Sequence, residues 1–406
     1  MFSSCTKFAF AVESKNETIN IAILGYGIVG SGVKEIVYKN FENIKRWSGS
    51  QVKVKKILVR KTHTEFLKNS EVFTSSFEKI LNDPKIKIVV ESMGGLDPAY
   101  KYVKKCLENG KSVVTPNKLL VATHGAELLK IAADNNLSFK FEASVCGGTP
   151  IIAPMMNSLN ANNIKKICGI VNGTTNFILT KMINENLSFE NALKMAQNLG
   201  YAESDPTADV EGLDAKNKIC ILASIACGEH IYPKNVRAEG ITKISLKDVE
   251  CAKNLGYAIK LIGYAEKSDN GKALIFVAPM LVPNSNPLSI ADDVFNAVLV
   301  DGDCTGKIMF YGKGAGKLPT ASAVVSDIID CINNFETPKK AAWKDSKNNN
   351  VNNFENFAAK FYIRFQKDNI EKFFVTEKMK VSDFNKYVKH LEKSGFKILS
   401  KIMVLD

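Results

Sequence analysis

The sequence has no hydrophobic run long enough to cross a membrane and no paired cysteine motif. None of its apolar stretches approaches the roughly 20 residues that a membrane helix requires. Its nine cysteines are scattered, and none forms a C-x-x-C pair. Cysteine spacing therefore indicates neither a metal site nor a redox motif. We expect a reduced, cytoplasmic chain with no membrane partner.

Basic charge is in excess but is not concentrated anywhere. The chain carries 54 Lys and Arg against 42 Asp and Glu, a formal net charge of +12. Lysines occur in every segment, and aromatic residues do not interleave with them, so a nucleic-acid partner is not indicated. A diffuse excess suits an anionic small ligand or simply solubility. The 406 residues exceed one ordinary domain of roughly 100 to 200 residues, so we expect two or three domains.

The N-terminal segment, residues 1–18, has a short apolar patch at 8–12 that Glu13 follows at once. This pattern predicts a disordered tail, with a targeting peptide as the alternative.

A glycine-rich turn follows the first regular element. Residues 19–24 are a β-branched run, and apolar residues resume at helical spacing from Val33. Strand, turn and helix in this order predict a dinucleotide-binding α/β domain. Its glycines would permit a tight turn, close approach of a pyrophosphate, and close packing of helix on strand. The cofactor-binding residues predicted in this turn are Gly25, Gly27, Ile28, Val29 and Gly30.

The next two apolar runs end in further cofactor candidates. A strand predicted over 52–59 ends at Arg60 and Lys61, and a basic residue there can pair with the 2′-phosphate of NADP. The alternative for this pair is a solvated strand end. A strand predicted over 86–90 leads into Ser92 and Met93, in a small-residue loop that suits contact with the cofactor.

Acidic residues crowd into residues 200–218. A helix predicted over 213–227 places Asp214 and Lys218, four apart, on one face. Carboxylates this dense repel one another unless they bind cations, so a substrate ammonium is a suitable ligand. A solvated surface ion pair is the alternative.

This stretch resembles the signature of homoserine dehydrogenases. The matching residues are Ala196, Gly200, Tyr201, Asp205, Pro206, Asp209, Gly212, Asp214 and Lys218. The resemblance extends from about residue 19 to about residue 330. It implies reversible NAD(P)H-dependent reduction of L-aspartate 4-semialdehyde to L-homoserine, in threonine, methionine and isoleucine biosynthesis. It also implies a homodimer or homotetramer.

The resemblance implies a domain order as well. A Rossmann domain, 19–150, would be completed by 311–332, and an α+β substrate-binding and dimerisation domain would span 151–310. The tail beyond would be a small α+β unit.

Roles for single residues come from the same resemblance. Lys218 would be the general acid, Asp214 would orient it, and Lys118 would be a second catalytic lysine that also touches the cofactor, as Gly316 would. The substrate-binding residues would be Gly173, Thr174, Glu203, Asp209 and Asp214. A monovalent cation such as sodium would be held by backbone oxygens of Glu142, Val145, Gly147 and Thr149. Cys146, where the family has a small residue, has no evident base nearby and is interpreted as a packed thiol.

The C-terminal part has a different composition. Residues 333–356 are polar and predict a linker, and residues 357–406 resemble a shortened ACT domain, with a helix expected over 381–393. A chain ending near Asn333 is therefore expected to remain soluble and active.

Two other functions compete with this interpretation. Another semialdehyde dehydrogenase would use a Cys thioester and a His base, but no Cys/His element stands out around the four histidines. A non-catalytic NADP-binding sensor would not need Lys118, Asp214 and Lys218.

Overall fold

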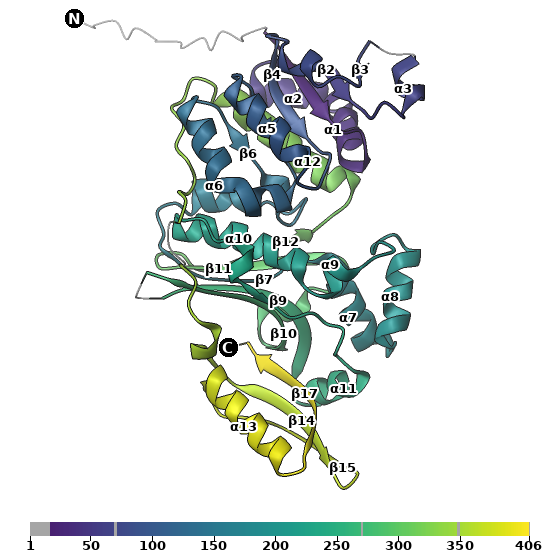
Figure 1. Ribbon diagram of the computed structural model, residues 1–406, viewed down its shortest axis with the longest axis vertical. Coiled ribbons are helices and arrows are strands. Elements are labelled where there is room, and N and C mark those ends of the chain that lie inside the picture. Colours follow the sequence, from purple (N-terminus) through teal and green to yellow (C-terminus); the bar gives the residue numbers. More distant parts are fainter. Residues whose placement is uncertain (1–16, 69–70, 269–270, 347–349, 406) are drawn as a thin grey trace, which may run out of the picture.

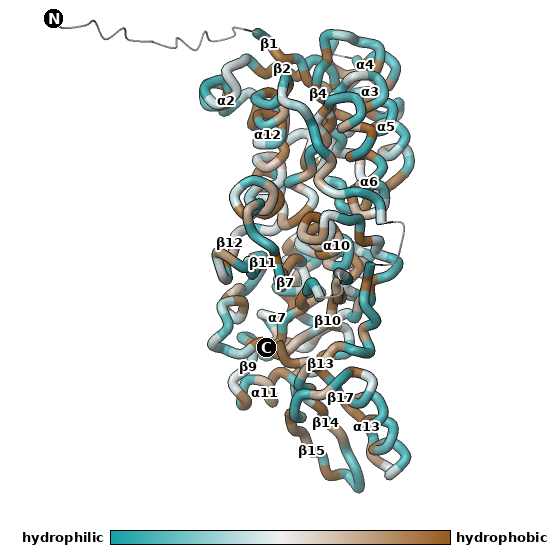
Figure 2. The backbone as a smooth tube through the Cα atoms, turned by 90° about the vertical axis from the view of Figure 1, so that its left-hand side faces the viewer, coloured by the Kyte–Doolittle hydropathy of each residue, from teal (hydrophilic) through white to brown (hydrophobic). Residues whose placement is uncertain are grey.

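The computed structural model describes residues 17–68, 71–268, 271–346 and 350–405. They form three tiers stacked along the long axis (Figure 1), and Figure 2 shows the same stacking from the side. The tail predicted over 1–18 lies outside this part of the chain, apart from residues 17 and 18, where the first strand begins at Thr18.

The first tier is a six-stranded parallel sheet in the order β3-β2-β1-β4-β5-β6. Its strands are β1 (Thr18–Leu24), β2 (Gln51–Leu58), β3 (Phe73–Thr74), β4 (Ile86–Glu91), β5 (Ser112–Val114) and β6 (Phe139–Lys140). The central strands are almost continuously apolar because helices cover both faces of such a sheet. The strand order reverses between β1 and β4, where dinucleotides bind in this fold. The predicted Rossmann fold class is confirmed.

The helices of this tier include one from far along the chain. They are α1 (Ile28–Lys39), α2 (Phe41–Ser48), α3 (Thr64–Lys68), α4 (Glu78–Leu81), α5 (Ala99–Glu108), α6 (Lys118–Asp134) and α12 (Lys317–Asn333). α12 packs against α1 and α2, and a Cβ added to Gly32 of α1 would lie 3.0 Å from the Ala321 Cβ. The chain beyond residue 313 therefore returns to the first tier.

The second tier is a mixed sheet with helices on one side. Its strands are β7 (Ile164–Ile170), β8 (Arg237–Ala238), β9 (Tyr257–Lys267), β10 (Ala273–Pro283), β11 (Phe295–Gly302) and β12 (Gly306–Lys313), and its helices are α7 (Gly173–Glu185), α8 (Phe189–Asn198), α9 (Thr207–Val210), α10 (Leu213–Cys227) and α11 (Leu246–Asn254). α10 packs on β9 and β10 and also contacts α6 of the first tier. The helix α10, which contains Asp214 and Lys218, therefore lies at the interface between the first and second tiers. We call this interface the seam.

The third tier continues the second sheet. It comprises β13 (Ala358–Ala359), β14 (Phe361–Lys367), β15 (Ile370–Val375), β16 (Met379–Lys380), α13 (Val381–Lys393) and β17 (Lys397–Val404). β17 pairs in parallel with β10, Met403 opposite Met280, and β14 and β15 follow in the same sheet. The C-terminal unit is therefore joined to the second-tier sheet by backbone pairing.

A buried ion pair also joins the third tier to the second. Arg364 Nε of β14 donates to Asp248 Oδ1 at 2.8 Å, and the two side chains are 8% and 0% exposed. Asp248 also closes the capping box with Ser245 at the start of α11. Burial alone would raise the pKa of the Asp248 carboxyl, but the hydrogen bonds from Arg364 and Ser245 hold it below its usual value.

The segment predicted as a linker is anchored to both upper tiers. Trp343 is 2% exposed, and its indole N–H donates to His230 Nδ1 at 2.9 Å. Because Nδ1 accepts, Nε2 carries the proton and donates to the Ala122 carbonyl of α6 at 3.0 Å. The described part of this segment contains little regular structure, but this one aromatic residue ties it to the core.

The eight cysteines within the described ranges are all free thiols. No helix in the same ranges has the length and apolar content needed to span a bilayer.

Candidate active site

Two lysines from different tiers meet one buried carboxylate at the seam. Asp214 lies in the first turn of α10 and is 4% exposed. Lys218 Nζ, one turn later, lies 2.7 Å from Asp214 Oδ2. Lys118 Nζ, from the first residue of α6, lies 2.6 Å from Asp214 Oδ1. We call Lys118, Asp214 and Lys218 the charged cluster.

The two lysines of the cluster lower the pKa of Asp214. Burial by itself would raise the pKa of Asp214, but the adjacent ammonium groups of Lys218 and Lys118 hold it well below its usual range. The Asp214 charge in turn raises the pKa of Lys118. Asp214 and Lys118 therefore form an ionised pair at neutral pH.

Asn172 connects the cluster to a second carboxylate. Its side-chain amide donates to Asp209 Oδ1 at 2.7 Å and to Asp214 Oδ2 at 2.8 Å, while its oxygen caps α7 by accepting from the Thr175 N–H. Burial, and then the charge of Asp214, raises the pKa of Asp209. The sequence analysis assigned the neighbouring Gly173 and Thr174 but not Asn172; an Asn at the start of a helix was the one local signal for it.

A hydrogen-bonded chain in the first tier positions Lys118. The side-chain oxygen of Asn117 caps α6 by accepting from the Leu120 N–H, and its side-chain amide donates to the Gly95 carbonyl at 2.7 Å. Its own N–H donates to Thr115 Oγ1, whose hydroxyl donates to Glu91 Oε2 at 2.6 Å. Glu91, fully buried at the end of β4, also accepts from the Met93 N–H. Glu91 therefore holds the β4 loop and the Lys118 turn together, a role that the sequence did not reveal.

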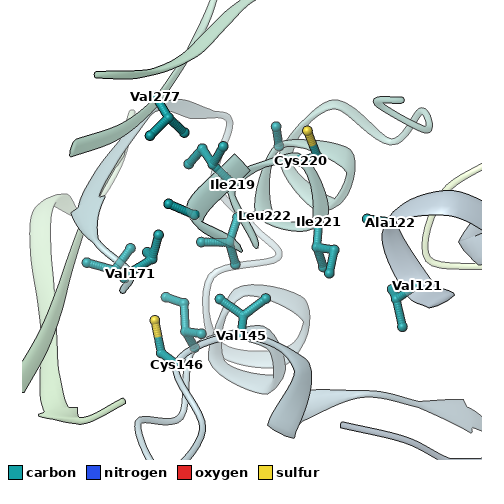
Figure 3. Packing of buried hydrophobic residues seen from close by; sticks show 14 of the residues in the cluster. Val121, Ala122, Val145, Cys146, Val171, Ile219, Cys220, Ile221, Leu222 and Val277 are labelled. Atoms are coloured by element: carbon teal, nitrogen blue, oxygen red, sulfur yellow. The ribbon is translucent and has the colours of Figure 1, made fainter. Parts of the chain in front are cut away.

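Apolar packing fixes α10 against the loop that contains Cys146. Figure 3 shows Ile219 and Leu222 of α10 facing Val171 and Val145, with Cys146 beside them. The Cys146 backbone has φ +56°, and burial raises the pKa of its thiol to about 11. These features agree with the interpretation of Cys146 as a packed thiol.

The glycine turn has one packed side and one open side. A Cβ on Gly25 (φ +95°) would lie 2.8 Å from the Ser92 carbonyl oxygen, and one on Gly30 would lie 2.2 Å from the Gly25 oxygen. Around Gly27, in contrast, no heavy atom of the described residues other than its chain neighbours lies within 4 Å of that position, and Ile28 is 71% exposed. The backbone at Gly27 can therefore approach a ligand, as the second glycine of a dinucleotide turn must.

The basic pair lies where sequence reasoning put it. Arg60 and Lys61 follow β2 and are exposed. The strand end is next to the glycine turn, because the Gly25 N–H donates to the Leu58 carbonyl at 3.0 Å. Neither side chain forms an ion pair with another described residue, so neither charge is already neutralised by a protein carboxylate.

The loop expected to hold a cation has an organised backbone. The Glu142 carboxylate accepts from the N–H groups of Ile151, Ile152 and Ala153, so it faces away from the loop. The Thr149 N–H donates to the Cys146 carbonyl, and Gly147 packs against Gly314, 2.5 Å from its would-be Cβ. Within the part of the chain described, no backbone N–H outside regular elements donates to the carbonyls of Val145 and Gly147.

The remaining predicted residues differ in exposure and local contacts. Gly173 begins α7 close to the Val294 carbonyl, and Thr174 Oγ1 donates to the Tyr201 carbonyl at 2.7 Å, which ties α7 to the signature. Glu203 is exposed, and its charge contributes to the raised pKa of Lys118 after Asp214 and Asp209. Gly316, also exposed, precedes α12 with φ +122°.

The molecule combines a Rossmann sheet and its glycine turn with the charged cluster of two lysines and one buried carboxylate. This combination defines a nucleotide-dependent oxidoreductase. Residues 25–142 match the homoserine dehydrogenase NAD-binding domain, and residues 150–329 match the homoserine dehydrogenase family. The homoserine dehydrogenase of Bacillus subtilis is 43% identical over 321 residues, 79% of this chain and 74% of that protein. The chain belongs to the homoserine dehydrogenase family.

Solved structures agree with this assignment. A homoserine dehydrogenase from Thiobacillus denitrificans superposes with a TM-score of 0.90 at 34% identity, covering 96% of this chain and 99% of that one. A hyperthermophilic archaeal homoserine dehydrogenase in complex with NADPH has a TM-score of 0.67 at 31% identity, covering 77% of this chain and 97% of that one. The first match extends through the third tier.

Proposed function

We propose that this protein catalyses the reversible NAD(P)H-dependent reduction of L-aspartate 4-semialdehyde to L-homoserine, a step of threonine, methionine and isoleucine biosynthesis. The observation that carries the proposal is the charged cluster at the seam between the nucleotide-binding tier and the second tier. The family membership and the NADPH bound by an archaeal relative support it. Purified protein mixed with semialdehyde and NADPH should oxidise the cofactor, measured by absorbance; no oxidation with either reduced cofactor would refute the proposal.

Lys218 is the proposed proton donor. Bound NADPH supplies the hydride, and the aldehyde oxygen then becomes alkoxide-like and needs a proton. Two of the three N–H donors of Lys218 are accounted for, one by Asp214 and one by the Val171 carbonyl at 2.8 Å. The third can be given to the substrate oxygen. In the reverse direction the neutral amine takes the proton back.

The other members of the cluster prepare this transfer. Asp214 orients both ammonium groups, and its charge raises the pKa of Lys118. Lys118, 44% exposed, stabilises the developing negative charge on the substrate oxygen. Asn172 acts as a positioning residue, because it fixes Asp214 and Asp209 with one amide.

The substrate ammonium is assigned to the acidic residues around the cluster. Glu203 and Asp209 are the proposed partners, with Gly173 and Thr174 at the start of α7 lining the same place. Glu203→Gln is expected to raise the KM for semialdehyde with little change in kcat, because an ammonium contact exists in both ground and transition states. Steady-state kinetics on Glu203→Gln and on Glu190→Gln, an exposed control on α8, would measure this. A change confined to kcat would contradict the assignment.

The cofactor is assigned to the turn Gly25, Gly27, Ile28, Val29 and Gly30, with Ser92, Met93, Lys118 and Gly316 nearer the reacting end. Arg60 and Lys61 would read the 2′-phosphate, which makes NADP the preferred form and NAD a possible one.

Arg60→Ala should weaken NADPH far more than NADH. Loss of one charged hydrogen bond corresponds to about 1.5 to 3 kcal/mol, roughly ten- to a hundred-fold in affinity. Titration of each cofactor by fluorescence would show it. Lys53→Ala, an exposed charge loss on β2, is the matched control. Equal weakening of both cofactors in Arg60→Ala would remove Arg60 from the phosphate site.

A monovalent cation such as sodium is proposed at the loop of Glu142, Val145, Gly147 and Thr149. The free carbonyls of Val145 and Gly147 are suitable hard oxygen ligands, and no cluster of three acidic, Cys or His side chains competes for a metal within the described residues. When bound, the cation would brace this loop against the Gly314 backbone.

A homodimer or homotetramer is proposed from the family resemblance. Light scattering coupled to size exclusion would give the mass directly, and a monomer at micromolar concentration would refute it.

A further inference from the structure

Glu91 and Thr115 are two polar residues of the first tier that are both 0% exposed. Val90 of β4 pairs with Val114 of β5, so Glu91 and Thr115 come next to each other at the carboxyl ends of these parallel strands. Neither side chain reaches the surface, and any part that they play in the reaction is exerted through other residues. Burying a carboxyl group is costly unless its oxygens accept hydrogen bonds, so the partners of Glu91 show what it holds.

One oxygen of Glu91 holds the loop that follows β4. Oε1 accepts from the Met93 N–H at 2.7 Å and from the Gly94 N–H at 3.2 Å. The Ser92 hydroxyl in the same loop lies 3.1 Å from the Gly25 carbonyl oxygen, to which it donates. This oxygen therefore fixes the loop that carries the proposed cofactor residues Ser92 and Met93 beside the glycine turn.

The other oxygen of Glu91 holds the turn that precedes Lys118. Oε2 accepts from the Thr115 hydroxyl at 2.6 Å, and the Thr115 oxygen in turn accepts from the Asn117 N–H at 3.0 Å. The hydroxyl suits this place because it donates in one direction and accepts from the other. Lys118 is the next residue, and its ammonium lies 2.6 Å from Asp214 Oδ1. Two consecutive hydrogen bonds thus connect Glu91 to the backbone beside Lys118.

A further hydrogen bond closes these contacts into a ring. The side-chain amide of Asn117 donates to the Gly95 carbonyl at 2.7 Å, so the loop 92–95 and the turn 115–118 are joined at two points. We propose that Glu91 and Thr115 are positioning residues of the reaction, which act through Lys118 and set its place relative to the cofactor loop. This assignment rests on the function proposed above, in which Lys118 stabilises the charge that develops on the substrate oxygen. A displacement of about 1 Å at such a group can cost roughly a hundred-fold in rate.

Thr115→Val tests the hydroxyl, because valine has nearly the same shape. It should lower kcat roughly ten- to a hundred-fold and leave NADPH affinity within about threefold, since the loop after β4 keeps its own contacts with Glu91. Thr115→Ser retains the hydroxyl and should recover most of the turnover. Thr305→Val removes an exposed hydroxyl that binds Asn162 and should change neither quantity. Normal kcat in Thr115→Val, or a Thr115→Ser variant as slow as Thr115→Val, overturns the proposal.

Glu91→Gln tests the carboxylate. Glutamine has one oxygen instead of two, so it can serve the Met93 and Gly94 N–H groups or the Thr115 hydroxyl, but not both. We expect its oxygen to stay with the two N–H groups and kcat to fall as in Thr115→Val. Normal kcat in Glu91→Gln overturns the role of Glu91.

A double-mutant cycle tests whether these residues act through Lys118. Residues that act through one group are not additive, so Thr115→Val should change kcat by less than about twofold when Lys118 is already alanine. The same loss in both backgrounds overturns the proposal, because a general structural effect would lower kcat with or without Lys118.

Chemical labelling of Lys118 gives a measurement that does not depend on turnover. Reductive methylation of the full-length protein with formaldehyde and borohydride, followed by peptide mass spectrometry, reports the reactivity of each lysine. Thr115→Val should label Lys118 at least about threefold faster than the unmodified sequence does, because an ammonium that leaves Asp214 releases its proton more readily. Lys130, exposed on the same helix, should be labelled at the same rate in both. Unchanged labelling of Lys118 overturns the positioning role, whereas faster labelling in a protein that does not reduce the semialdehyde supports that role and refutes only the function proposed above.

Discussion

Lys218→Ala is expected to lower kcat by roughly a hundred- to ten-thousand-fold while leaving NADPH affinity nearly unchanged, as for loss of a positioned acid or base. The reason is geometric. Lys218 is 11% exposed and directs two donors to Asp214 and Val171, so water has little room to replace the third. Lys118 keeps Asp214 paired at 2.6 Å, which should preserve the fold. Single-turnover kinetics and thermal melting would measure both quantities.

Lys218→Arg distinguishes proton transfer from electrostatics. Arginine keeps the charge but does not release its proton at accessible pH, so this variant should fail as Lys218→Ala does. Lys216→Ala, half-buried two residues earlier on α10, is the control and should retain turnover. Near-normal turnover in Lys218→Arg would mean that Lys218 only positions charge and that Lys118 or a water molecule donates the proton.

Deleting residues 334–406 is expected to yield protein that aggregates or fails to fold. The deletion would open the β10 edge that β17 now pairs with and leave Asp248 without Arg364. It would also uncover Phe276 and Met280, which share an apolar cluster with residues of the deleted part such as Phe361. An unpaired edge beside exposed apolar surface favours aggregation. The sequence had led us to expect a soluble, active truncated chain. Expression followed by size exclusion decides between the two outcomes.

A point variant tests the same interface without removing it. Arg364→Ala leaves the fully buried Asp248 uncompensated and should destabilise the protein by about 3 to 5 kcal/mol. Lys386→Ala, an exposed partner of Asp383 on α13, should change stability by less than about 0.5 kcal/mol. Denaturant titrations of both would show the contrast. Because the folded-state pKa of Asp248 is lowered, the stabilisation is present above the unfolded carboxyl pKa of about 3.9 and is lost as pH falls below it. A difference that persists unchanged below pH 3 would contradict this assignment.

Local patterns in the sequence determined several features correctly. The β-branched run before Gly25 and the helical spacing of apolar residues after it predicted a strand, a turn and a helix. A glycine turn and a clear periodicity of apolar residues are sufficient signals for these elements. The helix over residues 213–227 agrees with α10, and the four-residue spacing of Asp214 and Lys218 placed both on one face. The helix over 381–393 was also predicted with its observed ends. The resemblance to the family came from the same short-range spacings.

Features that join distant residues were decided by the tertiary structure alone. No spacing indicates that Lys118 meets Asp214, that Asn172 bridges two carboxylates, or that Glu91 holds the Lys118 turn, because each contact joins separate elements. Polar composition made residues 333–356 resemble a free linker, yet Trp343 is buried against His230. The backbone pairing of β17 with β10 made the C-terminal tail part of the second-tier sheet. The physical reason is that strand pairing and side-chain burial depend on which surfaces meet after folding, and a local pattern records only the preferences of its own segment.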